Sequence, residues 1–325
     1  MATESSTENN DNKTLIVLAS PSIKDSYYST KFKEIIEYMI NFAKLVQGKD
    51  QLVILVNPNT FSYFEEKIDS NQLIKAYIDD IWIRDVSPAI PDKQIKFKYS
   101  PSYLSSSFSS QCDKSFHKWI KQNDIQYNEI SDIILDGGNI VDNPAGTRVI
   151  ITEHILQSNP LLTKTTAKEK LKQILGVSEI AIIKEVPDDT TGHADGMVMW
   201  ATDDRLLYMK LEEPLHSEIM NELKTSFPNV EIIELPNYYV RETWRNFVTA
   251  RHVYVNSIVT DKYIYMPTFD SIHDIEMLNL FQSLTDKTVV GVPAESVCMM
   301  GGSVRCLSWQ AKGLNKKKIL QRIKP

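Results

Sequence analysis

The sequence repeats one unit, in which an amphipathic helix, a short polar break and a β-branched strand follow one another and a proline ends the strand. Two looser copies come first, "IIEYMINFAKLVQGKDQLVILVNP" and "FHKWIKQNDIQYNEI". Three further segments, "LKQILGVSEIAIIKEVP", "LKTSFPNVEIIELP" and "FQSLTDKTVVGVP", end at Pro187, Pro236 and Pro293. Because one such unit cannot bury its own apolar faces, the units must pack on one another. The repeat therefore predicts an α/β fold built from five similar units.

Periodicity predicts the elements inside each unit. Apolar residues spaced three and four apart, as in Ile35, Ile36, Met39, Ile40 and Leu45, predict helices. Runs such as "LVILV" and "AIIKEV" predict strands, and we expect further strands at "RVIIT", "GMVMW", "RLLYM", "HVYVNSIV" and "YIYMP". Since no GxGxxG or GxxxxGK motif follows a strand, a nucleotide-binding doubly wound fold is not favoured.

Composition sets the class of the protein. The 325 residues are 42% hydrophobic and 24% charged, which is enough apolar material for a sizeable core. A net charge of −6 and a pI near 5.6 argue against a general nucleic-acid binder, which needs a basic face. No apolar run approaches the roughly 20 residues that span a bilayer. Residues 1–13 are polar and predict a flexible tail, so residues 14–325 are expected to form a single domain that ends in a solvated helix at "NKKKILQRIKP".

The cysteines and histidines limit the chemistry. Cys112, Cys298 and Cys306 are odd in number and scattered, which indicates free thiols and a cytoplasmic protein rather than a disulfide framework. The six histidines form no HExxH motif and the cysteines no CxxC motif, so no metal site is expected.

A short polar segment follows each helix-and-strand unit. These segments are "DDIWIRD" (79–85), "LDGGN" (135–139), "TGHADG" (191–196), "RHVYVN" (251–256) and "GGSVRC" (301–306). Taken alone, "WIRD" reads as a strand ending in a surface Arg–Asp pair, and "DGG" as a turn. Because loops carry functional groups that a scaffold positions, five such segments on one axis would bring carboxylates, a histidine and a cysteine together.

The last segment raises the question of a nucleophile. Cys306 could be a buried core cysteine, the usual state of a free thiol. The preceding Gly301 and Gly302 instead favour a substrate that approaches the backbone closely, with the thiol as its nucleophile. A Cys–His protease of the papain type stays open, although the papain-type cysteine stands near the mature N-terminus.

A thiol, a histidine and several carboxylates suit attack on a cationic, planar carbon such as that of a guanidinium group. Carboxylates hold the N–H edges of a guanidinium by forked, charge-assisted hydrogen bonds. Its delocalised carbon is a poor electrophile, so attack on it needs a thiolate, while a histidine can move the protons. The same carboxylates would raise the pKa of Cys306. We therefore predict that the cationic substrate, or protonated His193, assists the ionisation of Cys306.

With these residues the chain resembles the agmatine deiminase and bacterial-type peptidylarginine deiminase family. The resemblance covers residues from about Leu15 to Gln310 through "DDIWIRDVSP", "ILDGGNIV", "TGHADGMV", "VYVNSIVTDKYIYMPTF" and "GGSVRCLSW". It implies the pentein fold, a five-bladed α/β-propeller with pseudo-five-fold repeats. It also implies a hydrolase that releases ammonia from a small guanidino substrate, without a metal or organic cofactor. A homo-oligomer is compatible with the sequence.

The resemblance assigns catalytic roles to five residues. Cys306 is implied as the nucleophile and His193 as the general acid and base. Asp85 and Asp195 are implied to grip the guanidinium, and Asp136 to orient His193.

The resemblance also assigns the residues around the substrate. Trp82 is implied to flank the substrate, and Asn256 matches a strand asparagine of the family. Together with Gly301 and Gly302, which the backbone argument selects, Asn256 is predicted to line the substrate site. Two departures affect the far end of the substrate. The stretch "KFKYSPSYLSSSFSSQ" lacks the tryptophan expected after the "RD" motif, and Thr191 replaces an acidic residue shortly before His193.

The substrate stays open at this point. Agmatine, which would give N-carbamoylputrescine, is the first expectation. The first alternative is free or peptidyl arginine, whose citrulline-forming reaction could use Arg241, Arg245 or Arg305 to hold a carboxylate. The others are amidino transfer and a non-catalytic scaffold that binds guanidino ligands or a protein.

Overall fold

Five pairs of parallel strands, each connected by a helix, form the framework of this computed structural model. The structure describes residues 13–245 and 247–323. The helix between the two strands supplies the crossover that a parallel pair needs. In chain order, the pairs and their main connecting helices are β1 (Leu15–Ala19), α1 (Phe32–Val46) and β2 (Gln51–Val56); β4 (Ile95–Lys98), α3 (Ser106–Gln122) and β5 (Glu129–Ile134); β7 (Arg148–Thr152), α5 (Lys164–Leu175) and β8 (Glu179–Ile183); β10 (Arg205–Met209), α6 (Leu215–Ser226) and β11 (Glu231–Leu235); and β15 (Tyr263–Thr268), α7 (Asp274–Ser283) and β16 (Thr288–Pro293).

An antiparallel strand lies beside the first strand of four of these pairs. The four are β17 (Trp309–Ala311) on β1, β6 (Val141–Asp142) on β7, β9 (Val198–Trp200) on β10 and β14 (Ile258–Val259) on β15. In the second unit this strand shrinks to a single antiparallel bridge, Ala89 to Ile95. The first unit therefore combines strands from opposite ends of the described chain, because β17 follows all four other units.

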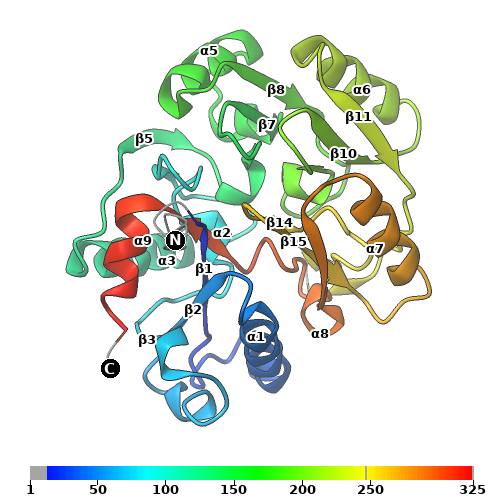
Figure 1. Cartoon of the computed structure of the whole chain (residues 1–325). Helices are drawn as coiled ribbons and strands as arrows, with labels where there is room; N and C mark the ends of the chain where they lie inside the picture. The colour runs from blue at the N-terminus through cyan, green and yellow to red at the C-terminus, as the bar shows by residue number, and fades with distance from the viewer. Residues whose placement is uncertain (1–12, 246, 324–325) are drawn as a thin grey trace, which may run out of the picture.

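The remaining elements extend or connect these sheets. They are β3 (Leu73–Lys75), which pairs with β2, the hairpin β12 (Thr243–Trp244) and β13 (Phe247–Val248), the short helices α2 (Ile83–Val86), α4 (His154–Ser158), α8 (Glu295–Cys298) and α9 (Gly313–Leu320), and the 3-10 turns η2 (Phe61–Tyr63), η3 (Ser70–Gln72), η4 (Gly137–Asn139) and η5 (Ala194–Gly196). Figure 1 shows the five units following one another around the middle of the molecule, with their helices toward the outside.

The apolar cores lie within and between neighbouring units. β1 is buried along its whole length, as expected for a parallel strand covered on both faces. One core cluster combines α1 and β2 with residues of the fourth and fifth units. Others join the first unit to α3, the second unit to the third, and the third to the fourth. Each unit therefore buries its faces against its neighbours.

The predicted helix-and-strand units are confirmed, including the buried positions Ile35, Ile36, Met39 and Ile40 of α1. The strand predicted at "HVYVNSIV" is wrong over most of its length, since only Ile258–Val259 is a strand. Residues 252–257 form turns that start at His252, whose φ is +64°. The polar groups of Asn256 in this segment bond other loops instead of a ladder partner. The expected flexible tail lies almost entirely outside the described residues.

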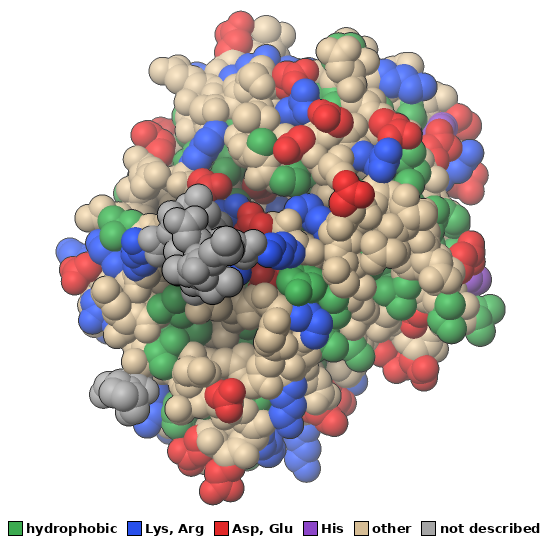
Figure 2. All heavy atoms as spheres, in the orientation of Figure 1, with side chains coloured by type: hydrophobic (Ala, Val, Ile, Leu, Met, Phe, Trp, Pro, Cys, Tyr) green, Lys and Arg blue, Asp and Glu red, His purple; other side chains and the backbone are tan. Residues whose placement is uncertain are grey.

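The surface carries charges of both signs. Figure 2 shows acidic and basic side chains interspersed over one face. The expected last helix is present as α9, but it is not fully solvated, because Lys316 and Ile319 are buried. Within the described residues, no helix is both long enough and apolar enough to cross a membrane.

Candidate active site

The five polar segments lie at equivalent places in the five units. Each one ends a few residues before the antiparallel strand of its unit: residues 79–85 precede the bridge at Ala89, and the other four precede β6, β9, β14 and β17. The repeat of the fold therefore repeats the position of these segments. Side chains from all of them except residues 135–139 line one cavity of about 1050 Å³, and Asp136 of that remaining segment bonds the histidine inside it.

Cys306 and Asn256 form one side of the site. The Asn256 amide donates to the Cys306 sulfur at 3.1 Å, and its oxygen accepts from the Cys306 backbone N–H at 3.3 Å. Gly302 lies against the same cysteine: a Cβ there would be 2.8 Å from Cys306 Cβ and 2.6 Å from the Trp82 ring. A Cβ on Gly301, whose φ is +101°, would be 3.0 Å from Phe247. Glycine is required here because these neighbours leave no room for a side chain.

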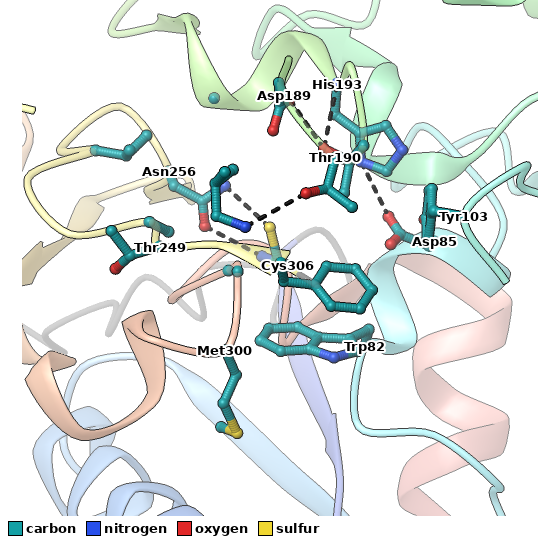
Figure 3. Close-up of a pocket in the computed structure, with 18 of the residues that line it drawn as sticks. Trp82, Asp85, Tyr103, Asp189, Thr190, His193, Thr249, Asn256, Met300 and Cys306 are labelled. Atoms are coloured by element: carbon teal, nitrogen blue, oxygen red, sulfur yellow. Dashed lines mark hydrogen bonds and ion pairs between the residues drawn. The ribbon is translucent and has the colours of Figure 1, made fainter. Parts of the chain in front are cut away.

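His193 lies between two carboxylates. Its Nε2 donates to Asp136 Oδ2 at 3.1 Å, and its Nδ1 is 3.7 Å from Asp85 Oδ1. The backbone N–H of Gly138 also donates to Asp85 Oδ1, at 3.0 Å. Figure 3 shows Cys306 in the middle of the site, with Asn256 on one side and Asp85 and Tyr103 on the other. The geometry brings the predicted histidine, carboxylates and thiol into one pocket.

Burial and neighbouring charges shift the ionisation of this group. Burial raises the pKa of Asp85 to about 7, although the charge of His193 opposes this. Burial alone would lower the pKa of His193, but the charge of Asp85 and the hydrogen bond of Asp136 outweigh it and raise that pKa to about 10. Burial, followed by the charges of Asp195 and Asp85, raises the pKa of Cys306 well above its ordinary value. These shifts favour a protonated His193 and a neutral Cys306 thiol.

Asp195 is held by a buried arginine. Arg305 donates to Asp195 Oδ2 at 2.8 Å and to the carbonyl of Ile140 at 2.6 Å, and both charged side chains are less than a tenth exposed. The sulfur of Cys306 is 3.7 Å from the same Asp195 oxygen. Arg305 was one of the arginines considered for a substrate carboxylate. That hypothesis is wrong for Arg305, because its guanidinium is already paired inside the protein.

The "WIRD" segment does not form the strand and surface ion pair that its sequence alone suggests. Instead of ending a strand with a surface ion pair, Ile83–Val86 form the short helix α2 with Arg84 and Asp85 buried. The Arg84 guanidinium donates to Gln310 Oε1 at 3.2 Å, and its backbone N–H donates to the carbonyl of Cys306 at 3.3 Å. This contact between two distant segments turns Trp82 and Asp85 into the cavity.

The outer part of the cavity contains the departures noted in the sequence. Thr191 donates to Asp189 Oδ2 at 3.1 Å, and the N–H of Gly192 donates to the same oxygen at 2.9 Å. Asp189 thus places a carboxylate on this wall, two positions before Thr191. The Arg245 guanidinium also lines the cavity, 4.4 Å from the Tyr27 ring centroid and 4.8 Å from that of Trp244. Arg241 also lines the cavity, 3.4 Å from Asp188.

Sequence reasoning missed two polar contacts of the site. The hydroxyl of Tyr103 donates to Asp136 at 3.3 Å, and Arg305 pairs with Asp195. Arg305 adjoins Cys306 in the "GGSVRC" segment, which was a usable signal, whereas Tyr103 stands in a stretch that carries no motif. Within residues 13–245 and 247–323, no group of three or more His, Cys, Asp or Glu side chains is arranged to hold a metal ion.

Comparisons with known proteins place this geometry in a family. The structure superposes on C. jejuni agmatine deiminase with a TM-score of 0.77, at 20% identity, over 94% of this chain and 95% of that chain. The agmatine deiminase of Enterococcus faecalis gives 0.74, at 16% identity, over 94% of both chains. These likenesses show a mixed α/β fold that resembles pentein structures.

Sequence comparison agrees with the structural likeness. A protein of Latilactobacillus sakei named "Putative agmatine deiminase" is 23% identical over 283 residues, which are 74% of this chain and 78% of the relative. The family profile described as Porphyromonas-type peptidyl-arginine deiminase matches residues 6–311. The chain therefore belongs to the Porphyromonas-type peptidyl-arginine deiminase family, which together with the agmatine deiminases comprises hydrolases acting on C–N bonds in linear amidines.

Proposed function

We propose that this protein is a cofactor-independent guanidine hydrolase in which Cys306 attacks the guanidinium carbon. One observation carries the proposal: buried carboxylates, Asp85 and Asp195, line the same cavity as a thiol, with Asp195 3.7 Å from its sulfur. Such a cavity favours a cationic ligand, because a cation compensates carboxylates that burial has removed from water. The five units around the middle of the molecule also support a five-bladed propeller, with this site near its axis.

The first half of the reaction releases ammonia. The bound guanidinium cation stabilises the thiolate, so the Cys306 thiol loses its proton to solvent when the substrate binds. The thiolate forms the S–C bond and gives a neutral tetrahedral adduct. Protonated His193 then donates its proton to one amino group, the C–N bond breaks, and ammonia leaves a thiouronium cation attached to Cys306.

The second half regenerates the thiol. Neutral His193 takes a proton from water as the oxygen bonds to the thiouronium carbon. The neutral adduct collapses, the C–S bond breaks, and the hydroxyl proton passes to the sulfur. The products are the ureido compound and the Cys306 thiol, with His193 protonated again. Asp136 holds the imidazole through both steps, and Asn256 holds the sulfur.

Agmatine is the first substrate that we propose, with N-carbamoylputrescine as the product. Similar solved structures include agmatine deiminases, one of them with substrate bound. Asp25, Asp188 and Asp189 on the outer wall of the cavity suit a distal ammonium group.

Free or peptidyl arginine is the second candidate, and Arg245 is the observation that favours it. This guanidinium lines the cavity and lies over the rings of Tyr27 and Trp244, where it could pair with a substrate carboxylate. A substrate with a free carboxylate at its far end would form an ion pair with Arg245, whereas agmatine, which has no carboxylate, would not.

A substrate panel tests both candidates. Ammonia release is measured with agmatine, free arginine, a blocked arginyl peptide and methylated arginines. The expected result is faster ammonia release from agmatine than from the other compounds. Faster release from free or peptidyl arginine would select the second candidate. The Arg245→Ala variant should lose activity only on carboxylate-bearing substrates.

Cys306→Ser tests the chemistry. The variant should keep the fold and lose ammonia release, because the serine hydroxyl lacks the acidity to form the attacking anion. Cys112→Ser is the matched control, since Cys112 is buried in an apolar core and does not line the cavity. Ammonia release by the Cys306→Ser protein would exclude the proposed nucleophile.

A further inference from the structure

Tyr103 contacts the carboxylate that holds the catalytic histidine. Its hydroxyl donates to Asp136 Oδ2 at 3.3 Å, and the same oxygen accepts from His193 Nε2 at 3.1 Å. The other oxygen, Asp136 Oδ1, is buried and has no hydrogen-bond partner among the described residues. One carboxylate oxygen therefore receives both donors, so the tyrosine and the histidine compete for its negative charge.

Ring contacts fix the tyrosine in this place. The edge of its ring meets His193, with ring centroids 6.2 Å apart, and Phe247 of the β12–β13 hairpin, at 5.8 Å. Phe247 in turn packs where a Cβ on Gly301 would lie, five residues before Cys306. Tyr103 therefore contacts both His193 and the β12–β13 hairpin, whose Phe247 packs against Gly301.

We propose that Tyr103 is a positioning residue that tunes the Asp136–His193 pair. The proposal rests on the proposed function, because it concerns the histidine to which we assign proton transfer. By donating to Asp136, the hydroxyl takes part of the charge that would otherwise stabilise the imidazolium. It thereby keeps His193 from holding its proton too tightly to donate it to the leaving amino group of the adduct.

Several other ionisable groups lie around His193 and also influence its pKa, so the Tyr103 hydroxyl controls only part of that pKa. They are Asp85 of α2, Asp136 before η4 and Asp195 of η5. Arg305 forms an ion pair with Asp195, and the Cys306 thiol lines the same cavity. The three carboxylates raise the pKa of His193, so the loss of one competing donor on Asp136 raises it further. The expected change is a rise of about 0.5 to 1 pH unit in the titration midpoint, the equivalent of one hydrogen bond.

The test compares Tyr103→Phe with the wild-type protein by NMR titration of the His193 ring. The phenylalanine keeps the ring contacts and removes only the hydroxyl, so the midpoint should rise while the thermal midpoint of unfolding changes little. Tyr127→Phe is the matched control, because the Tyr127 hydroxyl is buried without a hydrogen-bond partner among the described residues, outside the cavity. An unchanged His193 midpoint in Tyr103→Phe would overturn the proposal.

Two further measurements separate this result from the proposed function. In the Asp136→Asn background the Tyr103→Phe change should no longer move the His193 midpoint, because the two act through one oxygen; an undiminished shift there would contradict the proposed route. In turnover assays kcat should fall about 5- to 10-fold with KM within about two-fold. If the wild-type protein releases ammonia from no guanidino compound, the proposed function fails while the titration still decides the role of Tyr103.

Discussion

At the scale of single residues, the site depends on ionisable groups that burial has taken out of water. Asp85 is close enough to both Cys306 and His193 for its charge to raise the pKa of each, and the charge of His193 in turn opposes the raised pKa of Asp85. These shifts favour a protonated histidine and a neutral thiol in the free protein. In the proposed mechanism, a bound guanidinium cation supplies the charge that lets the thiol lose its proton, so we expect Cys306 to react slowly at neutral pH until substrate binds.

The first prediction concerns alkylation of Cys306 by iodoacetamide in the absence of substrate. Because burial, Asp195 and Asp85 raise the pKa of the thiol, the rate should stay low at neutral pH and keep rising above pH ~9, past the range of an ordinary cysteine. Mass spectrometry of the Cys306 peptide separates this reaction from that of the two buried cysteines.

Two variants check the cause of that pH dependence. Asp85→Asn removes a negative charge that opposes the thiolate, so the alkylation curve should move to lower pH. Asp188→Asn removes an exposed carboxylate at the outer cavity wall and should leave the curve in place. Full thiolate reactivity of the wild-type protein below pH 6 would contradict the argument.

At the scale of elements, each unit contains a helix that stabilises the fold and a polar segment that supplies side chains to the candidate site. Helix α5 is capped at its N-terminus by Thr163, whose side chain accepts from the Thr166 N–H while the Thr166 hydroxyl accepts from the Thr163 N–H. Gly176, in the left-handed conformation, caps its C-terminus. The helix buries Ala167, Leu171 and Leu175 against the third unit. The cap and the apolar face stabilise a helix that contributes no residue to the cavity.

The second prediction therefore separates stability from activity. Thr163→Ala should lower the free energy of unfolding by about 1 kcal/mol, because it removes the side-chain oxygen that accepts from the Thr166 N–H, and should leave ammonia release unchanged. Urea unfolding measures the first quantity. Thr165→Ala, at an exposed position in the same first turn, should be neutral or slightly stabilising; equal losses in the two variants would show that the cap contributes nothing.

At the scale of the whole molecule, the last strand completes the first unit. β17 pairs antiparallel with β1, and Trp309 lies opposite Val17 in that pairing. The Trp309 ring is fully buried and meets Phe116 and Trp119 of α3 in the second unit, at centroid distances of 5.5 and 6.5 Å. The end of the chain thus joins the first and second units, three residues after the proposed nucleophile.

The third prediction follows from that closure. Trp309→Ala should lower the free energy of unfolding by about 3–5 kcal/mol, since it leaves a cavity between two units. Trp309→Phe should lose less, because the Trp309 Nε1 has no hydrogen-bond partner among the described residues and its loss removes no bond. A loss below about 1 kcal/mol for the alanine variant, measured by urea unfolding, would mean that the units are held together elsewhere.

The sequence by itself determined the repeated units and the residues that gather in the site. Helical spacing and β-branched runs are local properties, so the helix and strand pairs of all five units could be predicted. The five polar segments could be predicted for the same reason, since each recurs at a fixed place relative to its unit. Where a segment's conformation depends on distant partners, prediction failed: "HVYVNSIV" and "WIRD" read as strands but form turns and a short helix.

Only the tertiary structure decided which polar groups satisfy one another. Arg305 and Asp195 are 110 positions apart, and Tyr103 and Asp136 are 33 apart, so no periodicity links them. Their pairing follows from the cost of burying a charge or a hydroxyl without a partner, which folding resolves by whichever group lies within reach. The ionisation of Cys306 and His193 follows from that same burial, which is a property of the assembled molecule.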